Sequence, residues 1–246
     1  MNSKNKIIVG AGILIGLILH GFLVGYALQR FRKEDRSISV KGLAEREVMA
    51  DQAVWTIKTE APVNDLLEGS RQIEGAKQKI ISFLKSNGVA DNEIIQLDLN
   101  VTDKVAQAYG SYNGNYRYLV QNSLQVRSPE VLKIQELSRR TDELLKIGIN
   151  ISSGNEYQPA VKYLFTGLND IKPEMLSEAT ANARKAAEEF TQDGNVDLGK
   201  MKSASQGLFS IVDRDASAQG DGGYVSSTND IYKKVRVVIH VVYSID

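Results

Sequence analysis

Apolar and polar residues follow two different periods along most of this chain, after a first stretch that is apolar throughout. Residues 7–28 carry no acidic or basic side chain other than that of His20. At about 1.5 Å of rise per residue, this stretch would form a helix of roughly 33 Å, close to the roughly 30 Å hydrocarbon core of a bilayer. The pattern therefore predicts a transmembrane helix over residues 7–28, with a short basic tail (1–6) before it and a juxtamembrane linker (29–37) after it.

A cleaved secretory signal is the alternative for this stretch, since Lys4 and Lys6 precede it. The apolar run is longer than the roughly 7–15 residues of a signal core, and basic residues follow it at once, which favours an uncleaved anchor. Basic residues on both sides leave the positive-inside rule undecided. A short basic tail is nevertheless typical of a signal anchor with its amino terminus in the cytoplasm, so the body is expected outside the cytoplasm.

Beyond residue 37 the pattern switches between period 2, typical of strands, and period 3.6, typical of helices. Caps are expected at Asn64 and Ser128, ahead of two of the helices. The third strand is expected to point Ile95, Leu97, Leu99 and Val101 inward. We predict strands near 38–42, 51–61, 95–101, 118–126, 149–153, 160–166, 201–212 and 232–245, and helices near 64–87, 129–147 and 172–192.

Two of these elements have a well-marked apolar face. The helix near 172–192 is expected to bury Leu176, Ala179, Ala183, Ala186, Ala187 and Phe190, and the last strand to bury Val235, Val237, Ile239, Val241 and Tyr243. The order strand, strand, helix, strand, strand occurs in both halves, which suggests an internal ββαββ duplication. Chance recurrence of the same order is the alternative. Either way we predict an α+β body of largely antiparallel sheet with long helices on one face.

Charge and cysteine content exclude several classes of function. Without residues 1–36, which hold six basic and two acidic side chains, 24 basic and 28 acidic side chains remain, a net charge of −4. Such a body is a poor candidate for binding nucleic acid. The absence of cysteine excludes disulfides, thiolate catalysis and Cys-based zinc sites.

The run ISVKGLAEREVMADQAVWTI at 38–57, which contains Gly42, Asp51 and Trp55, resembles the opening of SIMPL-domain proteins. The second half resembles the same family at Ala179, Ala183, the Arg-Lys-Ala at 184–186, the Asp-Leu-Gly ending in Gly199, and the strand at 235–237. Together with the apolar first segment, these motifs are similar to the membrane-anchored bacterial branch. The resemblance covers residues 38–245, so we expect a SIMPL-like domain over 38–246.

The resemblance implies a location more than a mechanism. Bacterial members are mostly exported or envelope-associated, some are linked to oxidative-stress tolerance, and one assembles into a ring-like homo-oligomer. An animal relative is an adaptor of a signalling kinase. The resemblance carries no catalytic residues, and we interpret Gly42 and Asp51 as structural, Gly42 for a backbone angle at a strand end and Asp51 as a cap or turn before the next strand.

A search for chemistry finds only weak candidates. A Ser-His-Asp site would have to rest on His240, which its strand more simply places at a surface or edge. The oxygens at Asp213, Asp215 and Asp221 suggest a calcium loop, but the EF-hand spacing and closing glutamate are missing. The loop at 110–116 lacks the ending of a phosphate-binding loop and fits a hairpin tip better. We therefore expect no enzyme activity, cofactor or metal.

Small residues in the predicted span point to helix packing. Gly12 and Gly16 form one GxxxG spacing and Gly21 and Gly25 a second, on roughly opposite faces of a helix. Contacts on two faces would suit a ring of copies. The alternative is that glycine is simply common in membrane helices.

The expectation is a single-pass protein of the inner (cytoplasmic) membrane with an extracytoplasmic body. It would bind lipid through residues 7–28, associate with itself, and act as a non-enzymatic scaffold in envelope or oxidative-stress tolerance, with an envelope protein as a further partner. The alternative is a small-molecule-binding protein or hydrolase with a site between the two halves of the body.

Overall fold

The computed structural model describes residues 12, 14–25, 36–107, 114–152, 160–215, 218–219, 223–224 and 228–245. These residues form two compact units. Unit 1 is built from the chain up to Glu45, from 172–209 and from 236–246, and unit 2 from 46–171 and 210–235. The division falls inside β1 (Ser37–Met49), α6 (Leu168–Asp193) and β11 (Tyr232–Ile245). Each unit is described by itself.

Unit 2 contains an antiparallel sheet in the order β3-β4-β2-β5, with β6 also paired to β2. Helices α2 and α4 pack against it, α2 on β2 and β4 and α4 on β2. The strands are β2 (Gln52–Val63), β3 (Ile94–Asp103), β4 (Tyr118–Ser128), β5 (Ile151–Ser152) and β6 (Val161–Leu164), and the helices are α2 (Leu66–Ser86), α3 (Lys104–Gln107), α4 (Val131–Arg139) and α5 (Thr141–Lys146). The predicted α+β body of antiparallel sheet and helices is confirmed.

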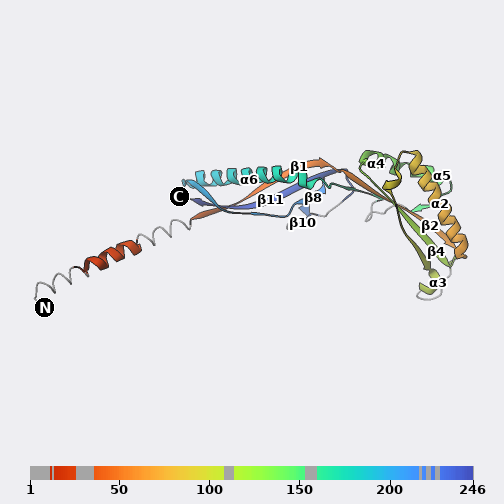
Figure 1. Ribbon diagram of the computed structural model, residues 1–246, viewed down its shortest axis with the longest axis horizontal. Helices are drawn as coiled ribbons and strands as arrows, with labels where there is room; N and C mark the ends of the chain where they lie inside the picture. Colours follow the sequence, from red (N-terminus) through yellow and green to blue (C-terminus); the bar gives the residue numbers. More distant parts are fainter. Residues whose placement is uncertain are drawn as a thin grey trace, which may run out of the picture. The chain divides into compact units, whose positions relative to one another are not determined.

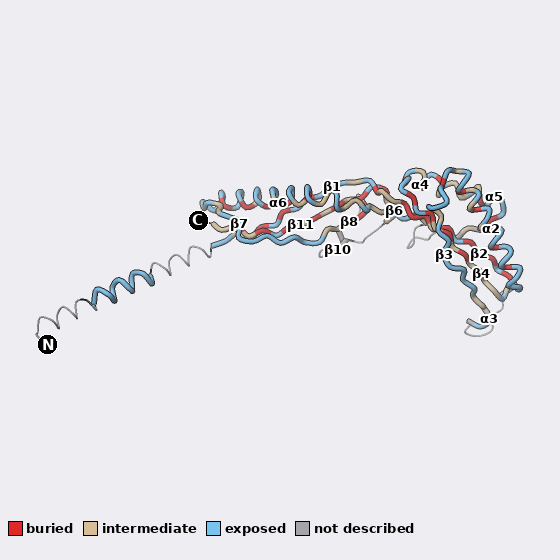
Figure 2. Tube along the Cα trace, viewed as in Figure 1, coloured by how far each residue is buried: buried red, intermediate tan, exposed pale blue. Residues whose placement is uncertain are grey.

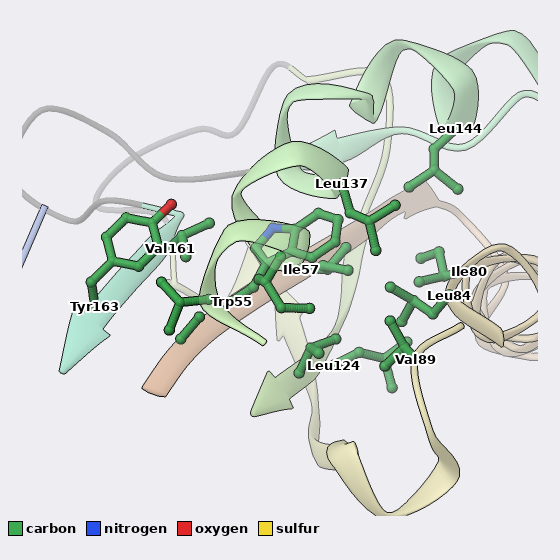
Figure 3. Close-up of a cluster of buried hydrophobic side chains, with 14 of the residues drawn as sticks. Trp55, Ile57, Ile80, Leu84, Val89, Leu124, Leu137, Leu144, Val161 and Tyr163 are labelled. Carbon is green, nitrogen blue, oxygen red and sulfur yellow. The ribbon is translucent and has the colours of Figure 1, made fainter. Parts of the chain in front are cut away.

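The core of unit 2 forms where α2 and α4 meet the sheet (Figure 3). The β2–β4 register places Trp55 opposite Val126 and Ile57 opposite Leu124, so these side chains share the face that the helices cover. Ile80 and Leu84 of α2 and Leu137 of α4 complete the cluster. Removing a side chain of this size from water contributes about 1.5–3 kcal/mol, so this cluster holds the helices to the sheet.

The second sheet has the strand order β1-β11-β7, with β8 (Ser210–Asp213) also paired to β11. Strand β7 (Leu198–Gln206) runs antiparallel to β11. The buried positions of β11 include all five residues predicted for its inward face, from Val235 to Tyr243, so that prediction is confirmed. Helix α6 lies along β1 and β11 (Figure 1) and buries Ala179, Ala183 and Ala187, spaced one turn apart.

Several predicted boundaries differ from the structure. The first strand continues to Met49, since Gly42 does not end it. Two helices, α4 and α5, separated at Arg140, replace the single helix expected over 129–147. The strand expected near 201–212 is divided into β7 and β8. The short strands β9 (Ala218–Gln219) and β10 (Gly223–Tyr224) lie between the strands predicted near 201–212 and 232–245, where no strand was predicted.

Both predicted helix caps are wrong by one or two residues. Asp65, not Asn64, caps α2, and its carboxylate accepts a hydrogen bond from the Leu67 amide at 2.7 Å. The Asn64 carboxamide instead accepts from the Arg117 amide. The N-cap position of α4 is held by Glu130, whose amide donates to the Ser128 hydroxyl. At α2 the adjacent side chains of Asn64 and Asp65 compete for the cap, and the contact of Asn64 with Arg117 leaves the cap to Asp65.

Two predicted apolar faces are partly wrong. On α6, Phe190 is 63% exposed and the buried positions are instead Met175, Ala179, Ala183, Ala187 and Thr191. On β3, the four residues expected inside are 39–54% exposed. Figure 2 shows β3 coloured as exposed over most of its length. In both cases the apolar residues do share one face of the element. The neighbouring elements cover only part of that face, so some of these residues stay exposed.

The described part of the predicted span, residues 12 and 14–25, is helical. Its large apolar side chains, from Leu14 to Val24, are 44–76% exposed. Among the described residues, no helix is both long and apolar enough to cross a membrane. The predicted tail and most of the predicted linker lie outside the described residues.

The two units do not coincide with the two halves that share an element order. Strand β1 of the first half lies in one sheet with β7, β8 and β11 of the second half. Strands β5 and β6 of the second half join the sheet of β2, β3 and β4. Each sheet therefore draws on both halves of the chain.

Candidate functional site

Gly42 lies where α6 crosses β1. A Cβ built on Gly42 would stand 2.7 Å from the Cβ of Ala183 and 2.8 Å from its backbone nitrogen, closer than real contacts allow. Gly42 does not have a positive φ and does not stand at a strand end, so our interpretation of a special backbone angle is wrong. The role is still structural, since the missing side chain lets the helix approach the strand.

Asp51 lies between β1 and β2 and holds the start of α6. Its carboxylate accepts hydrogen bonds from the amides of Thr166 and Gly167, at 2.8 and 2.9 Å, and from the Thr166 hydroxyl at 3.1 Å. These amides precede the first helical residue, Leu168, where a helix has donors without partners of its own. Asp51 is thus a cap, but for a helix more than a hundred residues later and not for the next strand.

Trp55 and Gly199 also occupy packing positions. Trp55 is fully buried in the core of unit 2, and its indole nitrogen has no hydrogen-bond partner among the described residues. A Cβ on Gly199 would lie 3.0 Å from the carbonyl oxygen of Ser244, beside an irregularity in the β7–β11 pairing. All four residues that carry the family motif therefore shape the fold.

A buried ion pair joins β8 to β11. The Lys233 ammonium contacts the Asp213 carboxylate, and the second oxygen of Asp213 accepts from the Asn229 amide at 3.1 Å. Lys233 is only 2% exposed. The Asp213 oxygens are therefore committed to an ammonium and an amide. This argues against the calcium loop that the sequence suggested weakly, and among the described residues no cluster of three or more His, Asp or Glu could hold a metal ion.

His240 lies on the exposed face of β11, as its strand position predicts. Its Nε2 is 2.5 Å from the Ser39 hydroxyl on β1, and in the register it stands opposite Ser205 of β7. A serine within hydrogen-bond distance of a histidine is the first requirement of a nucleophilic site. The sequence offered no sign of this pairing, because the two residues are 201 positions apart.

Strand β3 exposes four large apolar side chains, Ile95, Leu97, Leu99 and Val101. Leu99 and Val101 stand opposite Asn122 and Val120 of β4, and an irregularity at 97–98 separates them from Ile94 and Gln96. Among the described strands β3 pairs with β4 alone, so it forms an edge of its sheet. A long edge strand with exposed apolar side chains is a ready template for another strand. We call β3, Ile94–Asp103, the acidic edge, since its charged residues are Asp98 and Asp103.

A second exposed edge is β7, which pairs with β11 on one side. Residues 200–206 are all exposed, including Met201. Its charged residues are Lys200 and Lys202, so we call β7, Leu198–Gln206, the basic edge. Period-2 patterns look the same in covered and uncovered strands, so the sequence could not show that these edges lie open.

The acidic edge ends in an ion pair. The Arg117 guanidinium donates to the Asp103 carboxylate at 3.0 Å, and the pair is partly exposed. This hydrogen bond lowers the pKa of Asp103 and raises that of Arg117. Asp103 also accepts from the amides of Val105 and Ala106, so it fixes the turn from β3 into α3.

The remaining candidate residues, in the predicted span and in two loops, form no site among the described residues. A Cβ added at Gly12, Gly16, Gly21 or Gly25 would meet no atom within 4 Å, so this chain alone leaves both GxxxG faces open. His20 is helical and exposed. Residues 110–113 of the glycine-tyrosine loop, with Tyr112, lie outside the described residues, as does Asp221.

Comparison with protein families gives a match over most of the chain. Residues 38–243 match the family model described as "SIMPL: Protein of unknown function (DUF541)". No curated protein matches the chain. The family match covers both units and includes all four of the structural motif residues.

Proposed function

The chain belongs to the SIMPL family, and we propose that it is a membrane-anchored protein that associates with itself and acts by binding rather than by catalysis. Its body would lie outside the cytoplasm, held at the inner membrane by residues 7–28. Its role would be that of a scaffold in envelope or oxidative-stress tolerance. Besides further copies of itself, an envelope protein is its expected partner.

One observation supports the proposed membrane anchor. Residues 14–25 form a helix whose large apolar side chains are 44–76% exposed. A soluble helix normally buries one apolar stripe and exposes a polar one. Apart from His20, this segment has no polar side chain, and a lipid environment would take up its apolar side chains on every face.

The open sheet edges support self-association. The acidic edge exposes four apolar side chains, and the basic edge exposes nearly its whole length. Soluble proteins rarely leave long apolar edges unprotected, and such surfaces mark contacts with other chains. The residues of the family motif, by contrast, are occupied in packing and capping, so they offer no reacting groups.

The anchor is tested by washing membranes from cells that express the full chain with alkaline carbonate. We expect the protein to stay in the membrane pellet, and Ile18→Arg combined with Leu19→Arg to release it, because each charge near the centre of a span costs about 2.5–3.5 kcal/mol. Ile18→Leu with Leu19→Ile is the matched control. Release of the unaltered protein would contradict the anchor.

Orientation and self-association are tested on the same material. Protease added outside intact spheroplasts should digest the body, while a cytoplasmic marker stays whole. Light scattering of the detergent-solubilised full chain should give a mass well above one copy. A body protected from protease would reverse the orientation, and a monomer would remove self-association from the proposal.

One observation favours a second function, that of a hydrolase. The Ser39 hydroxyl and the His240 ring are at hydrogen-bond distance on exposed strand positions. If this pair is reactive, a fluorophosphonate probe will label the protein, and both Ser39→Ala and His240→Gln will abolish the labelling. Ser205→Ala, opposite His240 on the other neighbouring strand, is the control. No labelling would dismiss this alternative.

A further inference from the structure

Two of the exposed edges, the acidic edge and the basic edge, carry opposite charge. The acidic edge, β3, contains Asp98 and Asp103 and no basic residue, and Asp103 is paired with Arg117. The basic edge, β7, contains Lys200 and Lys202 and no acidic residue. By comparison β1, the other end of the second sheet, mixes Lys41 and Arg46 with Glu45 and Glu47. The charge pattern therefore sets β3 and β7 apart as a matched pair.

We propose that the acidic edge of one copy docks against the basic edge of a second copy, β3 beside β7. The contact rests on the self-association proposed above and names the surfaces that produce it. Among the described strands, each of these two edges has no partner on one side, so strand addition would join the two sheets by main-chain hydrogen bonds.

The side chains of the two edges also differ in size. The acidic edge presents Leu97, Leu99 and Val101, each 40–54% exposed. The basic edge presents Met201 and then a run of small residues, Ser203, Ala204 and Ser205. Large side chains on one strand against small ones on the other can pack without voids.

Charge argues against each edge pairing with its own kind. Two copies of β3 would bring Asp98 close to a second Asp98, and two copies of β7 would bring Lys200 close to a second Lys200. Like charges opposed across strands destabilise the pair, whereas opposite charges stabilise it. The register of β3 with β4 and that of β7 with β11 each contain an irregularity. Such irregularities make an edge strand a poorer template for strands that do not match it.

A contact between two different surfaces of the same chain is heterologous. It leaves one acidic and one basic edge open on every dimer, so association continues until a ring closes or a filament forms. The masses observed should therefore exceed that of a dimer.

The test uses the full chain in detergent, with the dissociation constant measured by sedimentation. Asp98→Lys alone and Lys200→Asp alone should each raise the dissociation constant about tenfold or more, and the two together should restore it, because the charges are then exchanged. Glu189→Lys and Lys185→Glu, on the exposed face of α6, make the same charge changes elsewhere and should have no effect.

Cross-linking identifies the contacting strands directly, since the chain contains no cysteine. A short bis-maleimide should join Leu99→Cys chains to Met201→Cys chains when the two are mixed, and neither variant to itself. The double variant should give a ladder of products. Circular dichroism confirms that each variant is folded.

The outcomes separate the contact from the self-association it rests on. An unaltered protein that is monomeric overturns both. An oligomer that is indifferent to the charge exchanges and gives no mixed cross-link overturns the β3–β7 contact and leaves self-association standing. Cross-linking of Leu99→Cys to itself also overturns the proposal, since it would show that two acidic edges meet.

Discussion

Gly42 on β1 and Ala183 on α6 lie so close that a side chain on Gly42 would stand 2.7 Å from the Ala183 Cβ. We expect Gly42→Val to destabilise the protein by about 1–3 kcal/mol, the usual cost of overpacking, because α6 would have to move away from the strand. Urea unfolding followed by circular dichroism measures this.

Gly75, on the exposed side of α2, is the matched control, since a Cβ there meets nothing within 4 Å. Gly75→Ala should stabilise the protein by about 0.5–1 kcal/mol, because alanine suits a helix interior better than glycine. If Gly42→Val left the stability unchanged, the close approach of α6 to β1 would be wrong.

The buried pair of Lys233 and Asp213 should be sensitive to the loss of one partner. Lys233→Met would leave the Asp213 carboxylate in the interior without its ammonium, at a cost of about 3–5 kcal/mol. Adding Asp213→Leu to Lys233→Met should recover part of this loss, since the uncompensated charge is removed. The urea midpoints of the single and double variants provide the test.

The exposed pair of Lys146 and Asp142 on α5 is the control for this prediction. Lys146→Met removes the same kind of contact from a solvated surface and should cost no more than about 0.5 kcal/mol. Equal effects at the two sites would show that the Lys233 pair is not truly buried.

Removing the Asp51 carboxylate should loosen the start of α6. Asp51→Ala leaves the Thr166 and Gly167 amides without their acceptor and should cost about 1–2 kcal/mol, as for other helix caps. Hydrogen exchange should rise at those amides first. Asp65→Ala, which removes the cap of α2, is the control and should raise exchange at Leu67 instead. A folded Asp51→Ala protein that lost an activity would contradict a purely structural role.

Tyr163 should make stability depend on alkaline pH. Burial raises the pKa of its hydroxyl above the usual value near 10, because ionisation in the core is unfavourable. The native state therefore holds this proton more tightly than the unfolded state. Its contribution is fully present below about pH 10 and is lost as the pH rises through the raised native pKa.

The free energy of unfolding should therefore fall above about pH 10, and less steeply in Tyr163→Phe. Val161→Ala, in the same strand and core cluster, changes packing without removing a titrating group and should keep the original slope. A Tyr163→Phe slope equal to that of the unaltered protein would show that this hydroxyl is not held in the core.

The local pattern was most informative for elements whose apolar face is fully covered. The alternation along β11 identified its five buried apolar residues, and the helical spacing of apolar residues identified the inner face of α6 at Ala179, Ala183 and Ala187. The same reasoning failed on β3 and at Phe190, where the apolar period is present but no neighbouring element among the described residues covers it. Periodicity reports which residues share a face, not whether another element lies over it.

The pairings between distant residues could not have been obtained from the pattern at all. Asp51 caps α6 across more than a hundred residues, Lys233 meets Asp213, and Ser39 meets His240, each through the way the sheets are assembled. The sequence offered only the residue types. Its spacing made Asp213 part of a weak calcium-binding pattern. Spacing along the chain cannot show that Lys233, on the neighbouring strand of the sheet, forms an ion pair with this carboxylate.

By itself, the sequence determined the α+β class, the order of most elements and the membership of the SIMPL family, because local periodicity and short motifs are properties of the chain. Tertiary structure alone decided that each sheet draws strands from both halves and that Gly42 serves close packing rather than a special backbone angle. It also decided that, among the described strands, β3 and β7 lie at exposed sheet edges of opposite charge. Those features depend on which strands become neighbours, and neighbours are chosen by the burial of the whole core rather than by any one segment.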